Sequence, residues 1–172
     1  MFLNYIKEFS AKKILKNSLQ NAKGNSSSGI IKTVGLVIDQ RYFLETDALI
    51  KEFIANGILE ENIEVIVYGD MFKNNINSGR VTFGSKHLQW NAEIDNPGVN
   101  NFIDKEFDLL ISYYNIEKAI LLVVTHNSKA HFKVGFSAID KRFNSLIINT
   151  NADNQKVFTQ ELFRYLKILN KI

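Results

Sequence analysis

The sequence predicts a three-layer α/β domain with a mostly parallel sheet, preceded by a basic amphipathic helix. Two observations support this prediction. Short apolar, β-branched runs alternate with longer segments of helical periodicity, which is the order expected of β-α-β units. The short runs are apolar throughout, which is typical of parallel strands covered by helices on both faces. The 172 residues suffice for one such domain.

Residues 2–22 have the spacing of an amphipathic helix, with lysines placed between its apolar residues. The glycine- and serine-rich stretch 23–29 then predicts a flexible linker. We therefore expect two parts: residues 1–29 with the helix and linker, and residues 30–172 as a single α/β domain. Whether the helix docks on that domain or stays free is open at this level. The apolar residues of the expected helix face are Phe2, Ile6, Phe9, Ile14, Leu15 and Leu19.

The first β-α-β unit follows the linker. Residues 31–38 form a β-branched run of strand length that ends at Asp39. Apolar residues at helical intervals indicate a helix within 45–58, and residues 63–68 form a second strand. A crossover of this length predicts parallel pairing with a right-handed connection.

The second half of the chain continues the alternation after a weakly patterned region, 71–100, that holds one candidate strand at 80–83. Pro97 is placed to begin a short helix through Asp104, with Asp95 and Asn96 as capping candidates. Residues 116–125 fit a buried helix or a strand, and we favour the helix. Further strands are expected at 107–111, 131–136 and 146–150, and a last helix from residue 155. The complete pattern is that of a Rossmann-like sheet.

Composition excludes several classes of protein. The chain has no cysteine, which rules out disulfides and thiolate chemistry and fits a reducing compartment. The N-terminus lacks the uninterrupted apolar core of an export signal. The longest apolar run, 119–124, is far shorter than the roughly 20 residues that span a bilayer. We expect a cytoplasmic protein without a transmembrane segment.

Positive charge is concentrated at the N-terminus. Residues 1–32 carry a net charge of +5, which leaves −2 for the rest of the chain. A cationic arm on a near-neutral domain favours an anionic partner, either RNA or the ribosome or an anionic membrane surface, bound through residues 2–23. The lysines that would make this contact are Lys7, Lys12, Lys13 and Lys16.

Ligand sites of open α/β sheets lie at the carboxyl ends of the strands. The candidates there are Asp39, Arg41, Asp70, Ser112 and Tyr113. No glycine-rich phosphate loop follows the first strand, and no G-x-S-x-G nucleophile motif is present. We expect no catalytic residues and no cofactor, and interpret the protein as a binding module more readily than as an enzyme.

The histidines His87, His126 and His131 lack metal-ligand spacing, so no metal site is predicted. His126 and His131 could face an anion together with Lys129 and Lys133. The alternative is that these side chains are simply solvated.

Trp90 stands alone among polar residues. It is a candidate anchor for a partner, since tryptophan is enriched at interaction hot spots. The alternative is that it covers the core beneath a loop.

The stretches MFLNYIKEF, KTVGLVID, FDLLISYY, SKAHFKVGF and ELFRYLKILNKI resemble an uncharacterised family of small proteins of Bacteroidota, along essentially the whole chain. That resemblance implies no activity. FDLLI followed by an apolar segment and KVGF is similar, over residues 31–150, to the N-terminal Rossmann-like half of heptosyltransferase-type glycosyltransferases. Those enzymes hold the nucleotide-sugar mainly with a second domain, which this chain lacks, so the resemblance implies the fold and argues against glycosyl transfer by this chain alone.

Three functional hypotheses follow. The first is a non-enzymatic binding or adaptor protein that contacts an anionic assembly through its N-terminal helix, with RNA or the ribosome favoured over a membrane. The second is a small-molecule or nucleotide-sugar binding domain, derived from a degenerate glycosyltransferase half, that uses the loops after the strands. The third is a structural subunit of a larger complex, with Trp90 and the N-terminal helix as buried contacts.

Overall fold

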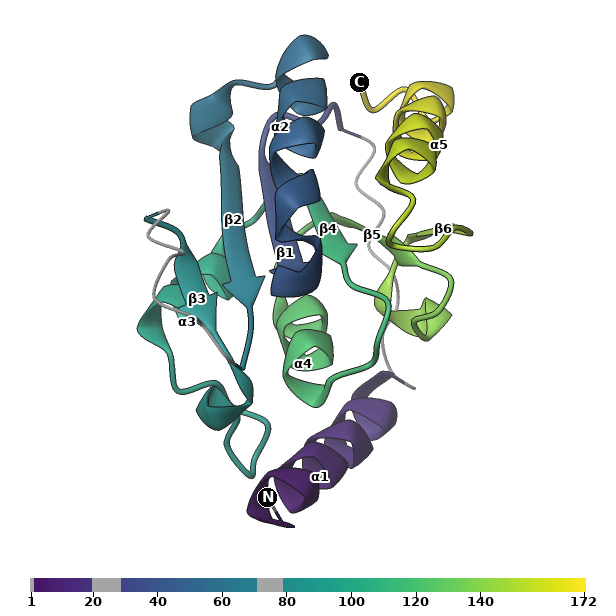
Figure 1. Ribbon diagram of the computed structural model, residues 1–172. Coiled ribbons are helices and arrows are strands. Elements are labelled where there is room, and N and C mark those ends of the chain that lie inside the picture. The colour runs from purple at the N-terminus through teal and green to yellow at the C-terminus, as the bar shows by residue number, and fades with distance from the viewer. Residues whose placement is uncertain (1, 20–28, 71–78) are drawn as a thin grey trace.

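The computed structural model of the chain describes residues 2–19, 29–70 and 79–172. Among them six strands form a single sheet, in the order β3-β2-β1-β4-β5-β6, and every neighbouring pair is parallel (Figure 1). The prediction of an α/β fold with a parallel sheet is confirmed. The strands are β1 (Val34–Asp39), β2 (Ile63–Tyr68), β3 (Val81–Phe83), β4 (Leu109–Tyr113), β5 (Phe132–Phe136) and β6 (Leu146–Ile148).

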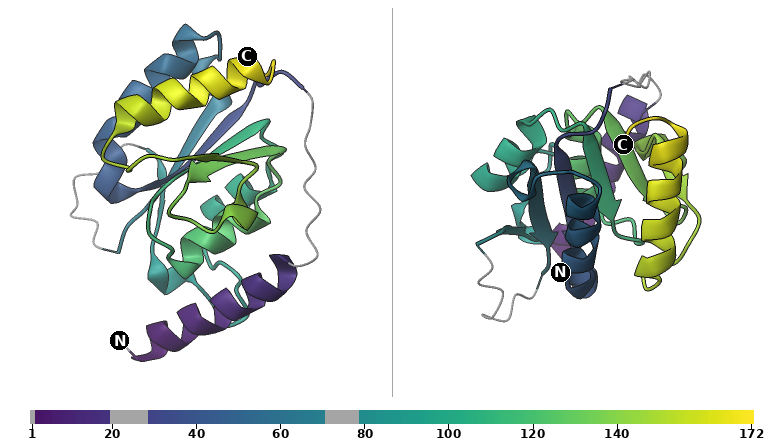
Figure 2. Two further views of the ribbon diagram at one scale, coloured as in Figure 1. Left: turned by 90° about the vertical axis from the view of Figure 1, so that its right-hand side faces the viewer. Right: turned by 90° about the horizontal axis from the view of Figure 1, so that it is seen from above.

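Helices cover both faces of this sheet. One face carries α2 (Thr46–Ala55) and α5 (Gln155–Ile168), and the other carries α3 (Pro97–Asp104) and α4 (Ala119–Asn127) (Figures 1 and 2). Successive side chains along a strand point to opposite faces of the sheet, so the apolar residues of each strand are divided between two cores. In β1, Leu36 and Ile38 pack toward α2 and α5, whereas Val37 packs toward α3 and α4.

The helix α1 (Phe2–Leu19) adds a fourth layer (Figure 2). It packs against the side of α4 that faces away from the sheet. Its buried residues are Ala11, Leu15 and Leu19, spaced four apart on one helix face, and they belong to the same core as α3 and α4. The N-terminal helix is therefore docked on the domain, which the sequence had left open.

The docked face differs from the one expected. Leu15 and Leu19 are buried, but Phe9 and Ile14 are exposed. The apolar residues of α1 lie on more than one side of the helix, so spacing alone did not indicate which side turns inward.

The ambiguous segment 116–125 is helical from Ala119 onward, so the favoured interpretation holds for most of it. Every residue of α4 from Ala119 to Thr125 is buried. A helix that is apolar on all sides must be enclosed on all sides. The sheet covers one side of α4 and α1 covers the opposite one, which accounts for a helix without a polar face.

Smaller predictions are confirmed with shifted boundaries. The candidate strand at 80–83 is β3, and α3 begins at Pro97, with the side chain of Asn96 accepting a hydrogen bond from the Val99 N–H at 3.2 Å. The first strand starts three residues later than expected, because the Ile31 N–H bonds the Lys171 carbonyl near the C-terminus. The expected linker, apart from Gly29, and residues 71–78 lie outside the described residues.

No helix in the described part of the chain combines the length and hydropathy needed to cross a membrane.

Candidate functional site

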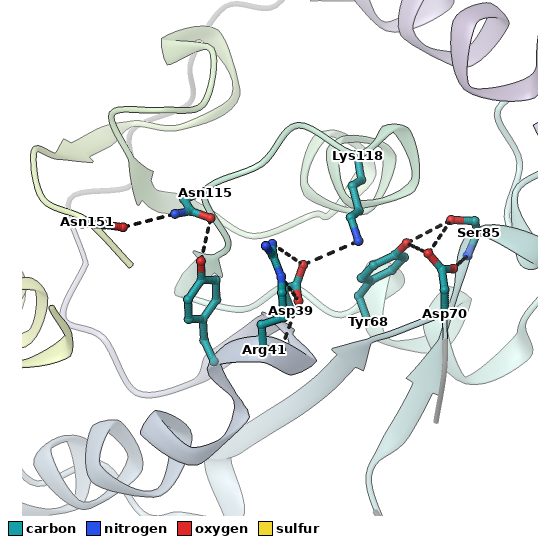
Figure 3. A network of polar contacts seen from close by, with 9 residues as sticks. Asp39, Arg41, Tyr68, Asp70, Ser85, Asn115, Lys118 and Asn151 are labelled. Atoms are coloured by element: carbon teal, nitrogen blue, oxygen red, sulfur yellow. Dashed lines mark hydrogen bonds and ion pairs between the residues drawn. The ribbon is translucent and has the colours of Figure 1, made fainter. Parts of the chain in front are cut away.

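The strand order places a topological switch point between β1 and β4. The chain leaves β1 toward β2 on one side and later enters β4 on the other side of β1. Open α/β sheets bind ligands at the carboxyl ends of the strands beside such a point. A row of polar side chains lies along this edge (Figure 3).

Asp39 is the centre of this row. It is the last residue of β1, and its side chain is only 2% exposed. The Arg41 guanidinium donates from Nε to Asp39 Oδ1 at 3.0 Å and from Nη2 to Oδ2 at 2.9 Å, and the Arg41 backbone N–H donates to Oδ1 at 3.1 Å. The Lys118 ammonium lies 3.8 Å from Oδ2. One buried carboxylate therefore holds two cations, and the hydrogen bond to Asp39 raises the pKa of Arg41 despite the opposing effect of burial.

Tyr68 and Asp70 form a second cluster at the end of β2. The Tyr68 hydroxyl donates to Asp70 and lies 2.9 Å from Ser85 Oγ, while the Ser85 N–H donates to Asp70 Oδ1 at 2.7 Å. Burial opposes ionisation of Asp70, but the hydrogen bonds from Tyr68 and Ser85 outweigh it, so the pKa of Asp70 is lowered. Burial and the hydrogen bond to Asp70 raise the pKa of Tyr68. Lys118 links the two clusters, because its Nζ lies 4.2 Å from the centroid of the Tyr68 ring.

A glycine allows these loops to meet. A Cβ at Gly84 would lie 2.6 Å from the carbonyl oxygen of Gly69, so no larger residue fits without moving the backbone. The segment that carries Ser85 is thereby held beside Asp70.

The row ends on the other side with amides. The Tyr42 hydroxyl donates to Asn115 Oδ1 at 2.9 Å, and Asn115 Nδ2 donates to Asn151 Oδ1 at 3.2 Å (Figure 3). Sequence reasoning did not single out Tyr42, Asn115, Lys118 or Ser85 as site residues. Lys118 directly precedes a buried helix and does not come directly after a strand, so only the folded edge shows its role.

The edge contains three of the five ligand residues predicted from sequence, Asp39, Arg41 and Asp70. The other two point into the core. The Ser112 hydroxyl lies 3.0 Å from Thr125 Oγ1 beneath α4, and the Tyr113 hydroxyl donates to the Ala152 carbonyl at 2.9 Å. The reason is that β4 continues two residues beyond its expected end at Ile111, so that both residues belong to a strand buried on both faces.

The lysines predicted near the histidines have separate partners. Lys129 pairs with Asp104 at 2.8 Å. The half-buried ammonium of Lys133 donates to the carbonyls of Thr125 at 2.7 Å and His126 at 3.1 Å, at the end of α4. Their functional groups therefore do not form a common anion site. The His126 imidazole instead lies 3.0 Å from the Ser18 hydroxyl and so joins α4 to α1.

Metal ligands do not gather anywhere in the described residues, where no group of three His, Asp or Glu side chains is arranged to hold an ion.

A groove of about 380 Å³ lies between α2 and α5, with Glu52, Gln155, Lys156 and Phe163 among its lining residues. It is on the face of the sheet opposite α1, and no residue predicted from sequence lines it.

A second candidate site is the outer face of α1, formed by Tyr5, Phe9, Lys12, Lys13 and Lys16. At 3.6 residues per turn these five positions share one side of the helix, next to the side that carries the buried Ala11, Leu15 and Leu19. Tyr5 is 71% exposed and Phe9 is 65% exposed. Lys13 and Lys16 are exposed and Lys12 is partly so.

Trp90 contacts a different side of α1, which carries Lys7 and Ser10. Its side chain is partly solvent-accessible, with the residue 45% exposed. The Lys7 ammonium lies 5.9 Å from its ring centroid, and the Ser10 hydroxyl donates to its carbonyl at 3.3 Å. The structure thus brings the lysines of α1 and Trp90, distant in sequence, to one end of the molecule.

Comparison with known proteins identifies the family and no activity. No curated protein and no solved structure gave a significant match. Residues 7–169, which include all but the first turn of α1, match the family described as "Family of unknown function (DUF6913)", and the chain belongs to that family.

Proposed function

We propose that this protein is a binding domain that attaches to an anionic lipid surface through the outer face of α1. The observation that carries the proposal is the alignment of two highly exposed aromatic rings, Tyr5 and Phe9, with three lysines on a helix whose neighbouring face is packed into the core. Exposed aromatic residues in line with cations are the composition of helices that lie at a membrane interface.

The chemistry of this face favours lipid over nucleic acid. All the basic residues of α1 are lysines. Lysine is a flexible point charge, whereas arginine is the residue preferred for bidentate phosphate and nucleic-acid recognition. A helix face is also convex, and proteins that hold single strands use grooves that follow the backbone. A flat anionic surface suits a convex face better.

The energetics are adequate for reversible attachment. Each lysine near an anionic membrane contributes about 1 kcal/mol, and insertion of the two aromatic rings adds apolar burial. Because α1 is already folded and docked, binding does not require the helix to be ordered, which would otherwise reduce the affinity.

The test is co-sedimentation of the full chain with vesicles of phosphatidylserine and phosphatidylcholine. The variant Lys12→Gln/Lys13→Gln/Lys16→Gln is expected to bind about a hundredfold more weakly, from about 1 kcal/mol per lysine. Tyr5→Ser/Phe9→Ser is expected to weaken binding as well, and added salt should weaken binding of the parent chain.

The control removes the same charge elsewhere. Lys51→Gln/Lys156→Gln/Lys167→Gln changes exposed lysines of α2 and α5, on the opposite face of the sheet, and should bind like the parent chain. Equal binding by the α1 variant and the parent chain would refute the proposal. So would binding of the parent chain to RNA or ribosomes, lost in the α1 variant, without binding to vesicles.

A further inference from the structure

We infer a second binding site, for the phosphate group of a small metabolite, at the switch point between β1 and β4. Its cations are Arg41, from the loop after β1, and Lys118, from the start of α4 (Figure 3). This site is independent of the outer face of α1 and of the proposed membrane attachment.

The arrangement of the two cations carries the inference. Both are anchored on Asp39, whose carboxylate is buried beneath them, while the side chains of Arg41 and Lys118 remain 43% and 30% exposed. The Asp39 carboxylate lies inside the protein, and the two cations reach the surface at the carboxyl edge of the sheet. Two long side chains are thus held in position before any ligand arrives, which reduces the entropy lost on binding.

Other carboxylates also act on the two cations. Asp153 acts electrostatically on Arg41. Burial opposes ionisation of Asp70, but the hydrogen bonds from Tyr68 and Ser85 and the charge of Lys118 lower its pKa. A phosphate would therefore be held by the placement of Arg41 and Lys118, and not by an excess of positive charge.

The geometry suits a tetrahedral oxyanion. Asp39 occupies Nε and Nη2 of Arg41, so a ligand oxygen would meet the guanidinium through Nη1 instead of through a bidentate fork. Lys118 approaches from a different element and adds a point charge. It is also the residue before the first turn of α4, where the helix dipole favours negative charge, and no side chain caps this turn. Single contacts from several directions match the oxygens of a phosphate.

These side chains replace the missing glycine loop. The absence of a glycine-rich motif after β1 excludes a phosphate cradle built from backbone N–H groups, but not one built from a guanidinium and an ammonium.

The chain contains a matched control for Arg41. Asp140 and Arg142 repeat the same local clasp, with the Arg142 N–H donating to Asp140 Oδ1 at 3.0 Å and Nη2 donating to Oδ2 at 2.6 Å. The neighbour of that clasp is Glu117, which accepts from the Asp140 N–H at 2.9 Å. A carboxylate there takes the place that Lys118 has beside Asp39, so Arg142 should not bind phosphate.

The test is an NMR titration of the full chain with inorganic phosphate, against sodium chloride at matched ionic strength. Amide shifts of residues 41 and 118–121 are expected to saturate with phosphate only. Lys118→Met keeps the aliphatic stem against Tyr68 and should weaken phosphate binding at least about tenfold, whereas Lys118→Arg should restore much of it. Arg142→Gln should bind as the parent chain does.

Three outcomes would overturn the inference. Phosphate shifts no larger than those with chloride would do so, as would equal affinity of Lys118→Met and the parent chain. The third is loss of vesicle binding in Lys118→Met together with loss of phosphate binding, which would assign a lipid headgroup to the site. Unchanged vesicle binding by that variant is the expected result and keeps the two sites separate.

Discussion

At the scale of single residues, the structural role of Lys133 could not be predicted from its residue type or its sequence neighbours. Its sequence position beside two histidines suggested a contact with an anion. In the structure its ammonium donates to the last carbonyls of α4, which have no partner within the helix. Burial lowers the pKa of Lys133 to about 8. The cation therefore satisfies two carbonyl groups at the C-terminal end of α4.

This burial makes stability depend on pH. The ordinary pKa of the group is 10.5, so between about pH 8 and that value the unfolded chain binds more protons at Lys133 than the folded chain does. The free energy of unfolding should therefore rise with pH in this window, by at most about 1.4 kcal/mol per pH unit from this group. Urea denaturation at several pH values measures the slope.

Lys133→Met is the control, because it removes the titrating group. Its stability should rise less steeply over the same window. Parallel slopes for the two proteins would show that Lys133 keeps an ordinary pKa in the folded state.

At the scale of elements, the packing of α1 against α4 accounts for the apolar sequence of α4 and for the buried face of α1. The sequence of α4, AILLVVTHN, has no polar face until its last residues, and the sheet can cover only one side of it. The other side is covered by α1, which turns Ala11, Leu15 and Leu19 inward and leaves Tyr5 and Phe9 outward. The same helix thus contributes to the core and presents the proposed membrane contact.

A pair of substitutions separates these two roles of α1. Leu15→Ala should lower the free energy of unfolding by about 2–4 kcal/mol, because it empties a buried position. Phe9→Ala, on the outer face, should change it by less than about 1 kcal/mol. Denaturation midpoints of the two variants measure the difference, and similar small losses in both would mean that α1 does not dock in solution.

At the scale of the whole molecule, the structure is four layers deep, and its two candidate sites have different origins. The outer face of α1 is a property of the outermost layer. The carboxyl edge is formed by loops from separate strands, and residues as distant as Asp39 and Lys118 meet there only because β4 pairs with β1. The sequence indicated which loops were polar, but not which of them would be neighbours.

The fourth layer predicts the result of truncation. A chain of residues 30–172 would expose the apolar outer side of α4, and exposed patches of that kind promote association. We expect this shortened chain to bind a hydrophobic dye and to elute from size exclusion as aggregates, unlike the full chain. A monomeric shortened chain with no dye binding would show that α4 does not need α1.

Much of the fold followed from local patterns. Apolar runs identified the strands, periodicity identified α2 and α5, and Pro97 after Asn96 located the start of α3. The candidate site followed only in part. Asp39, Arg41 and Asp70 were found because they come directly after strands, whereas Ser112 and Tyr113 were placed at the edge by an underestimate of the length of β4.

By itself the sequence determined the class of fold, the order of its elements and the concentration of lysines in the first helix, because these depend on residues close together in the chain. The tertiary structure decided which face of α1 turns inward, that Lys118 joins Arg41 on Asp39, and that Lys133 binds the end of α4. Each of these depends on which distant surfaces come into contact. The energy of such contacts comes from burial and pairing between residues distant in sequence, so it cannot be predicted from local periodicity.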